Sequence, residues 1–115
     1  MTRQLLLLET LSGHGTFAVG EAQIPVRYEF RIQQWFVEGA PGVGEIEGSM
    51  TVLNPQPSAA LIAAFADDSN SFPLTLEDGT VVQVEVFKLD NPAAPSWAQL
   101  EIGSGERYFD QRLKQ

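Results

Sequence analysis

The chain has 115 residues and a mass of 12.6 kDa, which is the length of a single domain over residues 1–115. Seven basic and fifteen acidic residues give a net charge of −8, which argues against nucleic acids or anionic membrane surfaces as partners, because binding them needs Lys and Arg. The absence of cysteine excludes disulfides, thiolate nucleophiles and zinc–thiolate sites.

The N-terminal segment resembles the start of a signal peptide only briefly. Its apolar run, Leu5 to Leu8, ends at Glu9 and is shorter than the ~7–15 residues of a signal-peptide core. No stretch approaches the ~20 apolar residues of a membrane span. We therefore expect a soluble, cytoplasmic protein.

The first third of the chain alternates between apolar and polar residues, as strands do. Residues 4–11 and 16–19 predict two strands, separated by a turn at Ser12-Gly13-His14-Gly15. Residues 24–37 predict a half-buried antiparallel strand with a charged outer face. The alternation slips at Gln33-Gln34, which predicts a bulge that bends this strand.

The middle of the chain predicts a turn, a strand and a short helix. Residues 39–42 are rich in glycine and proline and predict a turn before a strand over 43–53. Ser58 is a suitable N-cap for a helix that would cover about residues 58–67. This alanine-rich helix is expected to plug the end of a barrel or to cover a sheet edge.

A hairpin is predicted around Glu77-Asp78-Gly79, because apolar and polar residues alternate on both sides of it, over residues 72–86. A two-residue loop would mix apolar and polar side chains on one face. A three-residue loop, with Gly79 in the left-handed conformation, places Leu74 opposite Val82 and keeps one face apolar. We therefore predict the three-residue loop.

A further strand is expected over 97–102, and residues 106–115 read either as a last strand or as a tail. The total is about seven strands and one short helix. This pattern predicts a mainly β domain, either a small antiparallel β-barrel or a barrel-like sandwich.

Acidic residues are concentrated in the middle of the chain. No Lys or Arg occurs between Arg31 and Lys88, whereas eight acidic residues do: Glu38, Glu45, Glu47, Asp67, Asp68, Glu77, Asp78 and Glu85. Two interpretations stay open. The acids form either a solvated surface that keeps the protein dispersed or a face that meets a cationic partner or a metal.

Metal, cofactor and nucleophile signatures are weak. His14 is the only histidine, and its glycine neighbours are typical of a turn rather than of a catalytic base or a metal site. Asp67 and Asp68 are the only candidate metal ligands, in a segment that matches a calcium loop poorly because Phe72 replaces the required glycine. No cofactor is expected.

Two glutamates form the only candidate catalytic pair. Glu45 and Glu47 flank Ile46, so on a strand their carboxylates project from one face ~6.5–7 Å apart. Glycoside hydrolases use two carboxylates at about this separation. Alternating glutamates are also ordinary on an exposed strand, so an acid–base hydrolase is a remote hypothesis.

Aromatic residues near strand ends are the candidate binding residues. Trp35, Phe36, Trp97 and Tyr108 would line an apolar pocket or an oligomer interface if they cluster at the surface. Alternatively, the two tryptophans belong to the core, with each indole N–H bonded to a carbonyl.

Three functional hypotheses remain. The leading one is a non-catalytic module for protein interaction or self-assembly, with a second copy or another protein as its partner. The second is a small β-barrel that binds an apolar molecule inside, and the third is the acid–base hydrolase.

Overall fold

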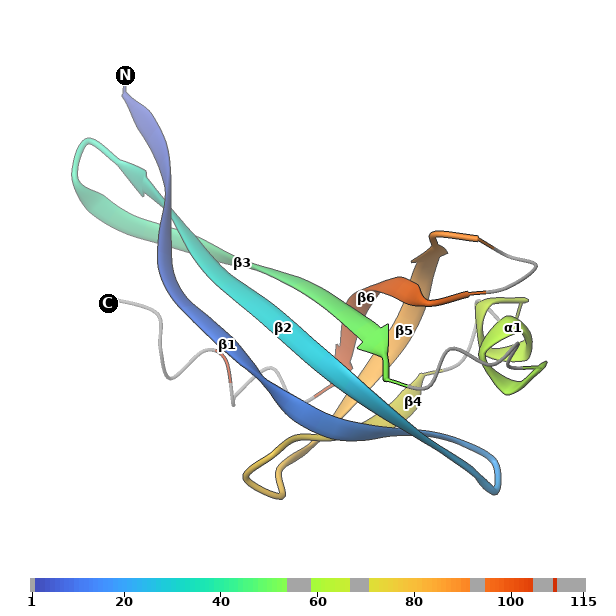
Figure 1. The fold of residues 1–115 in the computed structure, drawn as a ribbon. Helices are drawn as coiled ribbons and strands as arrows, with labels where there is room; N and C mark the ends of the chain where they lie inside the picture. The colour runs from blue at the N-terminus through green and yellow to red at the C-terminus, as the bar shows by residue number, and fades with distance from the viewer. Residues whose placement is uncertain (1, 54–58, 67–70, 92–94, 105–108, 110–115) are drawn as a thin grey trace.

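The computed structural model describes residues 2–53, 59–66, 71–91, 95–104 and 109 (Figure 1). These residues form β1 (Arg3–Val19), β2 (Ala22–Val37), β3 (Ala40–Val52), α1 (Ala59–Ala66), β4 (Phe72–Thr75), β5 (Val81–Leu89) and β6 (Trp97–Ser104). All strand pairs are antiparallel. The prediction of a mainly β, antiparallel domain with one short helix is therefore confirmed, but the described residues form six strands rather than about seven.

The difference in strand number arises at Gly13-His14-Gly15, which is not a turn. β1 runs through it as one strand of 17 residues. A Cβ atom on Gly15 would overlap the carbonyl oxygen of Thr75, and one on Gly13 would lie 2.5 Å from Glu77 Oε2. Gly15 thus allows β4 to approach β1 closely, Gly13 leaves room for the Glu77 side chain, and the turn prediction was wrong.

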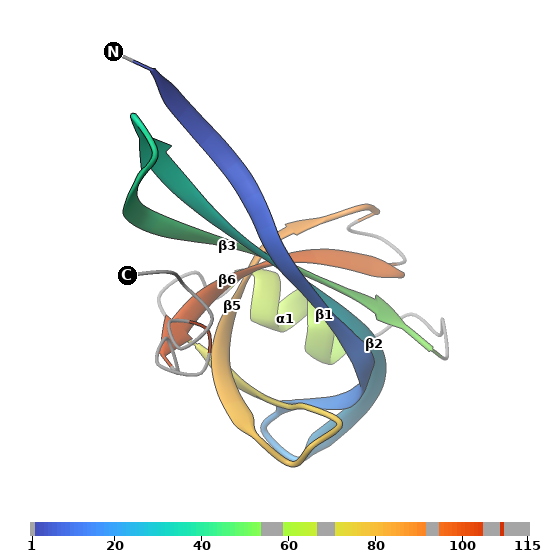
Figure 2. The same ribbon diagram turned by 90° about the vertical axis from the view of Figure 1, so that its left-hand side faces the viewer.

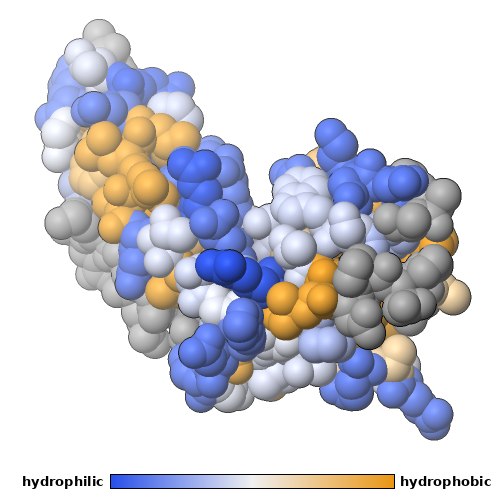
Figure 3. Space-filling view, in the orientation of Figure 1, coloured by the Kyte–Doolittle hydropathy of each residue, from blue (hydrophilic) through white to orange (hydrophobic). Residues whose placement is uncertain are grey.

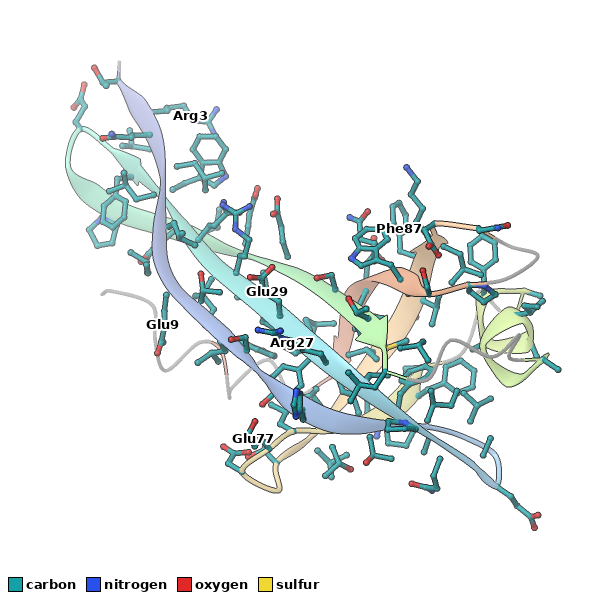
Figure 4. The ribbon with its side chains drawn as sticks, viewed as in Figure 1. Arg3, Glu9, Arg27, Glu29, Glu77 and Phe87 are labelled. Atoms are coloured by element: carbon teal, nitrogen blue, oxygen red, sulfur yellow. The ribbon has the colours of Figure 1, made fainter. Side chains whose placement is uncertain are left out.

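The strand order is closed, running β1-β2-β3-β6-β5-β4 and back to β1 (Figure 2). β1 and β4 close it through two pairs, Thr16 with Thr75 and Phe17 with Leu74. Glu77 reinforces this contact, because its N–H donates to Tyr28 Oη at 3.1 Å and its carboxylate accepts from the His14 N–H at 3.0 Å. Figure 4 shows Glu77 beside β1 at this junction.

The hairpin of β4 and β5 has the predicted register and loop. Leu74 lies opposite Val82. The Leu76 N–H donates to Thr80 at 2.7 Å, and Gly79, with φ 89°, donates to Leu76 at 3.0 Å. The three-residue loop is therefore confirmed, and it places the apolar face of the hairpin inside the closed sheet.

The core fills the closed part of the sheet. Its largest fully buried side chains include Phe17, Phe30, Phe109, Ile32, Met50 and Leu74. The helix occupies residues 59–66, within the predicted range, and packs against β5, with Ala64 only 1% exposed. Ser58 and most of the segment 106–115 lie outside the described residues.

Two local predictions for β2 and β3 were wrong in detail. The turn lies at Glu38-Gly39, whose φ angles of 52° and 83° suit a two-residue hairpin, so β3 already begins at Ala40. The alternation of exposed and buried side chains along β2 does not break at Gln33-Gln34 either. It continues to Gln34, which is 1% exposed and donates from Nε2 to the Gly42 carbonyl at 2.9 Å.

The bend predicted near Gln33 is instead made by the strands on either side of β2. β1 has one extra residue, Leu8, between the partners of Gln33 and Ile32. β3 has a register shift opposite Trp35. Because the extra residues are on β1 and β3, the alternation of buried and exposed side chains on β2 is kept up to Gln34. A bulge of this kind increases the local twist of a sheet.

Asp90 organises the connection between β5 and β6. Its carboxylate accepts from the hydroxyl of Ser96 at 2.6 Å and from the N–H groups of Ser96 and Trp97 at 3.0 and 3.1 Å. These donors, the Ser96 hydroxyl first, hold the pKa of Asp90 well below its ordinary value of 3.8.

We expect the Asp90→Ala variant to melt at a lower temperature than the unmodified chain at pH 7. A carboxyl whose pKa is lowered by folding stabilises the fold fully above its unfolded pKa and loses this contribution as the pH falls further. The difference in melting temperature should therefore shrink as the pH falls below 3.8, the ordinary pKa of this carboxyl. Thermal unfolding at pH 7 and pH 2 measures this, and an equal difference at both would contradict the assignment.

Candidate interaction surface

Three strands extend beyond the closed part of the sheet as a projection that we call the arm, consisting of residues 3–8, 33–37 and 40–47 (Figure 1). β6 pairs with β3 only from Gly48 onwards, and β4 pairs with β1 only at Thr16 and Phe17. The radius of gyration is 15.2 Å, against ~13 Å for a compact domain of this length. The arm is the main departure from a compact shape.

The arm exposes large apolar side chains on both of its faces. Leu6 lies opposite Gln34 and Leu7 opposite Gln33, so the two leucines project from opposite faces. Leu6 is 38% exposed, Leu7 49% and Val43 71%. Figure 3 shows a hydrophobic area on the arm, bordered by hydrophilic atoms.

Two of the residues singled out from the sequence are joined on the arm. The Trp35 indole N–H donates to Glu45 Oε1 at 2.9 Å. The guanidinium carbon of Arg3 lies 5.3 Å from the centre of a Trp35 ring, a cation–π contact, and Figure 4 shows Arg3 at the outer end of the arm. Trp35 is half-buried, and its N–H bonds a carboxylate rather than the carbonyl that a core position predicted.

Glu45 and Glu47 line an open groove of about 540 Å³ between β3 and β6. Glu101 and the apolar side chains of Ile46, Ile102 and Phe109 also line it. Both glutamates are exposed, and Glu47 lies 3.9 Å from Arg31. Exposed carboxylates that hydrogen-bond or ion-pair with neighbouring side chains are typical of surface charge. In the described part of the chain, no three acidic or histidine side chains group as metal ligands do.

The other candidate residues do not join this surface as one cluster. Phe36 is half-buried on the opposite face of the arm from Trp35. Trp97 is half-buried on β6 opposite Thr51, where it lines a separate groove with Glu29 and Arg31. Tyr108, Asp67 and Asp68 lie outside the described residues.

The exposed leucines and Val43 were not identified from the sequence as site residues. One signal was available. Four consecutive leucines on a strand must place apolar side chains on both faces, which a sheet covered on one side does not need.

No helix within the described ranges has the length and apolar character required to cross a membrane. Comparison of the chain with known protein families, curated proteins and solved structures finds no match, so the fold and its surface carry the functional argument.

Proposed function

We propose that this protein is a non-catalytic self-assembly module, and that the arm is the surface by which one copy binds another. The observation that carries the proposal is the exposure of Leu6, Leu7 and Val43 on the arm, along which neither β4 nor β6 pairs. Burying a large aliphatic side chain completely contributes ~1.5–3 kcal/mol, so even these partly exposed side chains favour association.

A second copy is the partner that the charges favour. The β1 and β2 parts of the arm, residues 3–8 and 33–37, contain Arg3 and no acidic residue, although the chain carries a net charge of −8. Two copies can therefore meet at this part of the arm without bringing acidic side chains together. Elsewhere the excess of negative charge opposes association of like molecules.

The two other hypotheses have less support. The interior of the closed sheet is filled by large side chains, including Phe17, Phe30 and Met50, which leaves an apolar ligand little room. Glu45 and Glu47 are exposed and each has a polar partner, which is unlike the environment of an acid–base pair. A native mass spectrum that shows a monomer with a bound small molecule would favour the ligand hypothesis instead.

We expect Leu7→Asp to weaken self-association at least about tenfold, because a charge in a buried apolar contact costs more than ~1.4 kcal/mol. Val81→Asp is the matched control. Val81 is 51% exposed, also lies on a strand, and belongs to the closed part of the sheet. Sedimentation equilibrium of both variants measures the effect. Equal association constants for the two variants would contradict the role of the arm.

A further inference from the structure

Along the arm, the backbone groups at the outer edge of β1 pair with no described strand. The Glu38 N–H donates to the Thr2 carbonyl at 2.9 Å, so the backbone groups of Thr2 point towards β2. Because these groups alternate in direction along an antiparallel strand, those of Gln4 and Leu6 also point towards β2. The N–H and C=O groups of Arg3, Leu5 and Leu7 point to the opposite edge, where no described strand pairs with residues 3–15 of β1.

Further along β1, the backbone groups at this outer edge do form hydrogen bonds. The His14 N–H points outward and donates to Glu77, and Thr16 pairs with Thr75 of β4. The edge of β1 therefore already accepts a neighbouring strand where the sheet closes. Along the arm, the same edge presents its backbone groups and pairs with no described strand.

Between Gln4 and Leu7 this edge has few of the features that usually prevent strand addition. Exposed edges are commonly protected by proline, by charged side chains or by coverage with another element. Residues 3–8 contain one charge, Arg3 at the outer end, followed by a glutamine and four leucines. The opposite edge of the arm, on β3, contains Pro41, Glu45 and Glu47. Self-pairing of β3 would bring its glutamates towards those of the second copy.

We propose that two copies of this chain pair through the outer edges of their β1 strands, antiparallel and about a twofold axis. This proposal rests on the proposed self-assembly and specifies its contact. The two arms then form one continuous sheet of six strands, in which Leu6 and Leu7 of each copy meet leucines of the other on both faces. A contact of this kind is isologous, so it closes as a dimer and does not extend into a filament.

Amide hydrogen exchange, resolved by residue, tests the pairing in the unmodified chain. In the monomer the amides of Gln4 and Leu6 are protected by β2, whereas those of Leu5 and Leu7 are not. In the dimer all four are bonded, so exchange at Leu5 and Leu7 should slow at least about tenfold when the protein concentration is raised above the dissociation constant. Gln4 and Leu6 serve as internal controls.

A backbone variant gives the second test. Leu5→Pro removes only an N–H that points away from β2, and proline is tolerated on an edge strand in that orientation. It should weaken the dimer at least about tenfold, because both copies lose a hydrogen bond at the contact. Leu5→Val keeps the N–H and an apolar side chain and should dimerise like the unmodified chain. Circular dichroism verifies that both variants fold.

The outcomes separate the two proposals. A dimer with slowed exchange at Leu5 and Leu7, lost in Leu5→Pro, supports the pairing. An oligomer in which these two amides exchange as fast as in the monomer overturns the pairing and leaves self-assembly standing. A monomer at every concentration overturns both.

Discussion

Replacing Phe30 with alanine is expected to lower the free energy of unfolding by about 3–5 kcal/mol, the usual loss for a buried phenylalanine. Phe30 is fully buried, and its ring centre lies 4.9 Å from that of Phe109 and 5.8 Å from that of Tyr28. A Cβ on Gly48 would lie 2.7 Å from the ring, so the ring leaves no spare space on that side. Gly48 has no side chain that could move into the space left by the ring, so the cavity would remain largely open.

The melting temperature should fall by roughly 10–25 °C, because each kcal/mol shifts it by several degrees in a domain of this size. Phe87→Ala is the matched control. Phe87 is 56% exposed on β5, and Figure 4 shows it away from the interior of the sheet. Its loss should change stability by no more than about 0.5 kcal/mol. Equal destabilisation of the two variants in urea titrations would contradict the described core.

Replacing Gly15 with valine is expected to lower the free energy of unfolding by about 1–3 kcal/mol or more, the cost of forcing bulk into a closely packed site. The added Cβ would overlap the carbonyl oxygen of Thr75, which is backbone and moves only with its strand. β4 has four residues and is paired with β1 at only two positions, so this clash falls on the contact that closes the sheet.

His14→Val is the control for this variant. His14 is exposed on the same strand, between the two glycines, and valine is well suited to strands. We expect its stability to stay within about 0.5 kcal/mol of the unmodified chain. Thermal unfolding compares the variants, and amide exchange at Thr16 reports on the β1–β4 pairing. A Gly15→Val variant that melts like His14→Val would contradict closure at this point.

The elements that could be predicted are those in which the residues of a turn or cap and the alternation of apolar and polar side chains point to the same structure. In the β4–β5 hairpin, one register alone keeps an apolar face, and Gly79 supplies the conformation which the loop needs. The helix at 59–66 likewise follows from a proline-containing linker and an alanine-rich run. In both cases the deciding information lies within a few residues.

The errors arose where contacts distant in sequence decide the structure. Gly13 and Gly15 have the composition of a turn, and only the close approach of the Thr75 backbone explains why the strand needs glycine at position 15. Gln34 looked like a break in the apolar pattern, yet it is buried and bonded to Gly42. A single sequence without its strand order does not contain these contacts.

The residues of the candidate surface were only partly singled out from the sequence. The sequence drew attention to aromatic residues, of which Trp35 and Phe36 lie on the arm. The exposed leucines were treated as an ordinary strand, because their exposure depends on where β4 and β6 stop pairing. The point at which β4 and β6 stop pairing is decided by the whole sheet and not by the residues of β1.

Sedimentation equilibrium of the unmodified chain over a wide concentration range tests the central claim most directly. The protomer mass is 12.6 kDa. Assembly through the arm predicts a discrete dimer of twice that mass at high concentration, which dissociates on dilution. A mass of 12.6 kDa at every concentration would contradict the account.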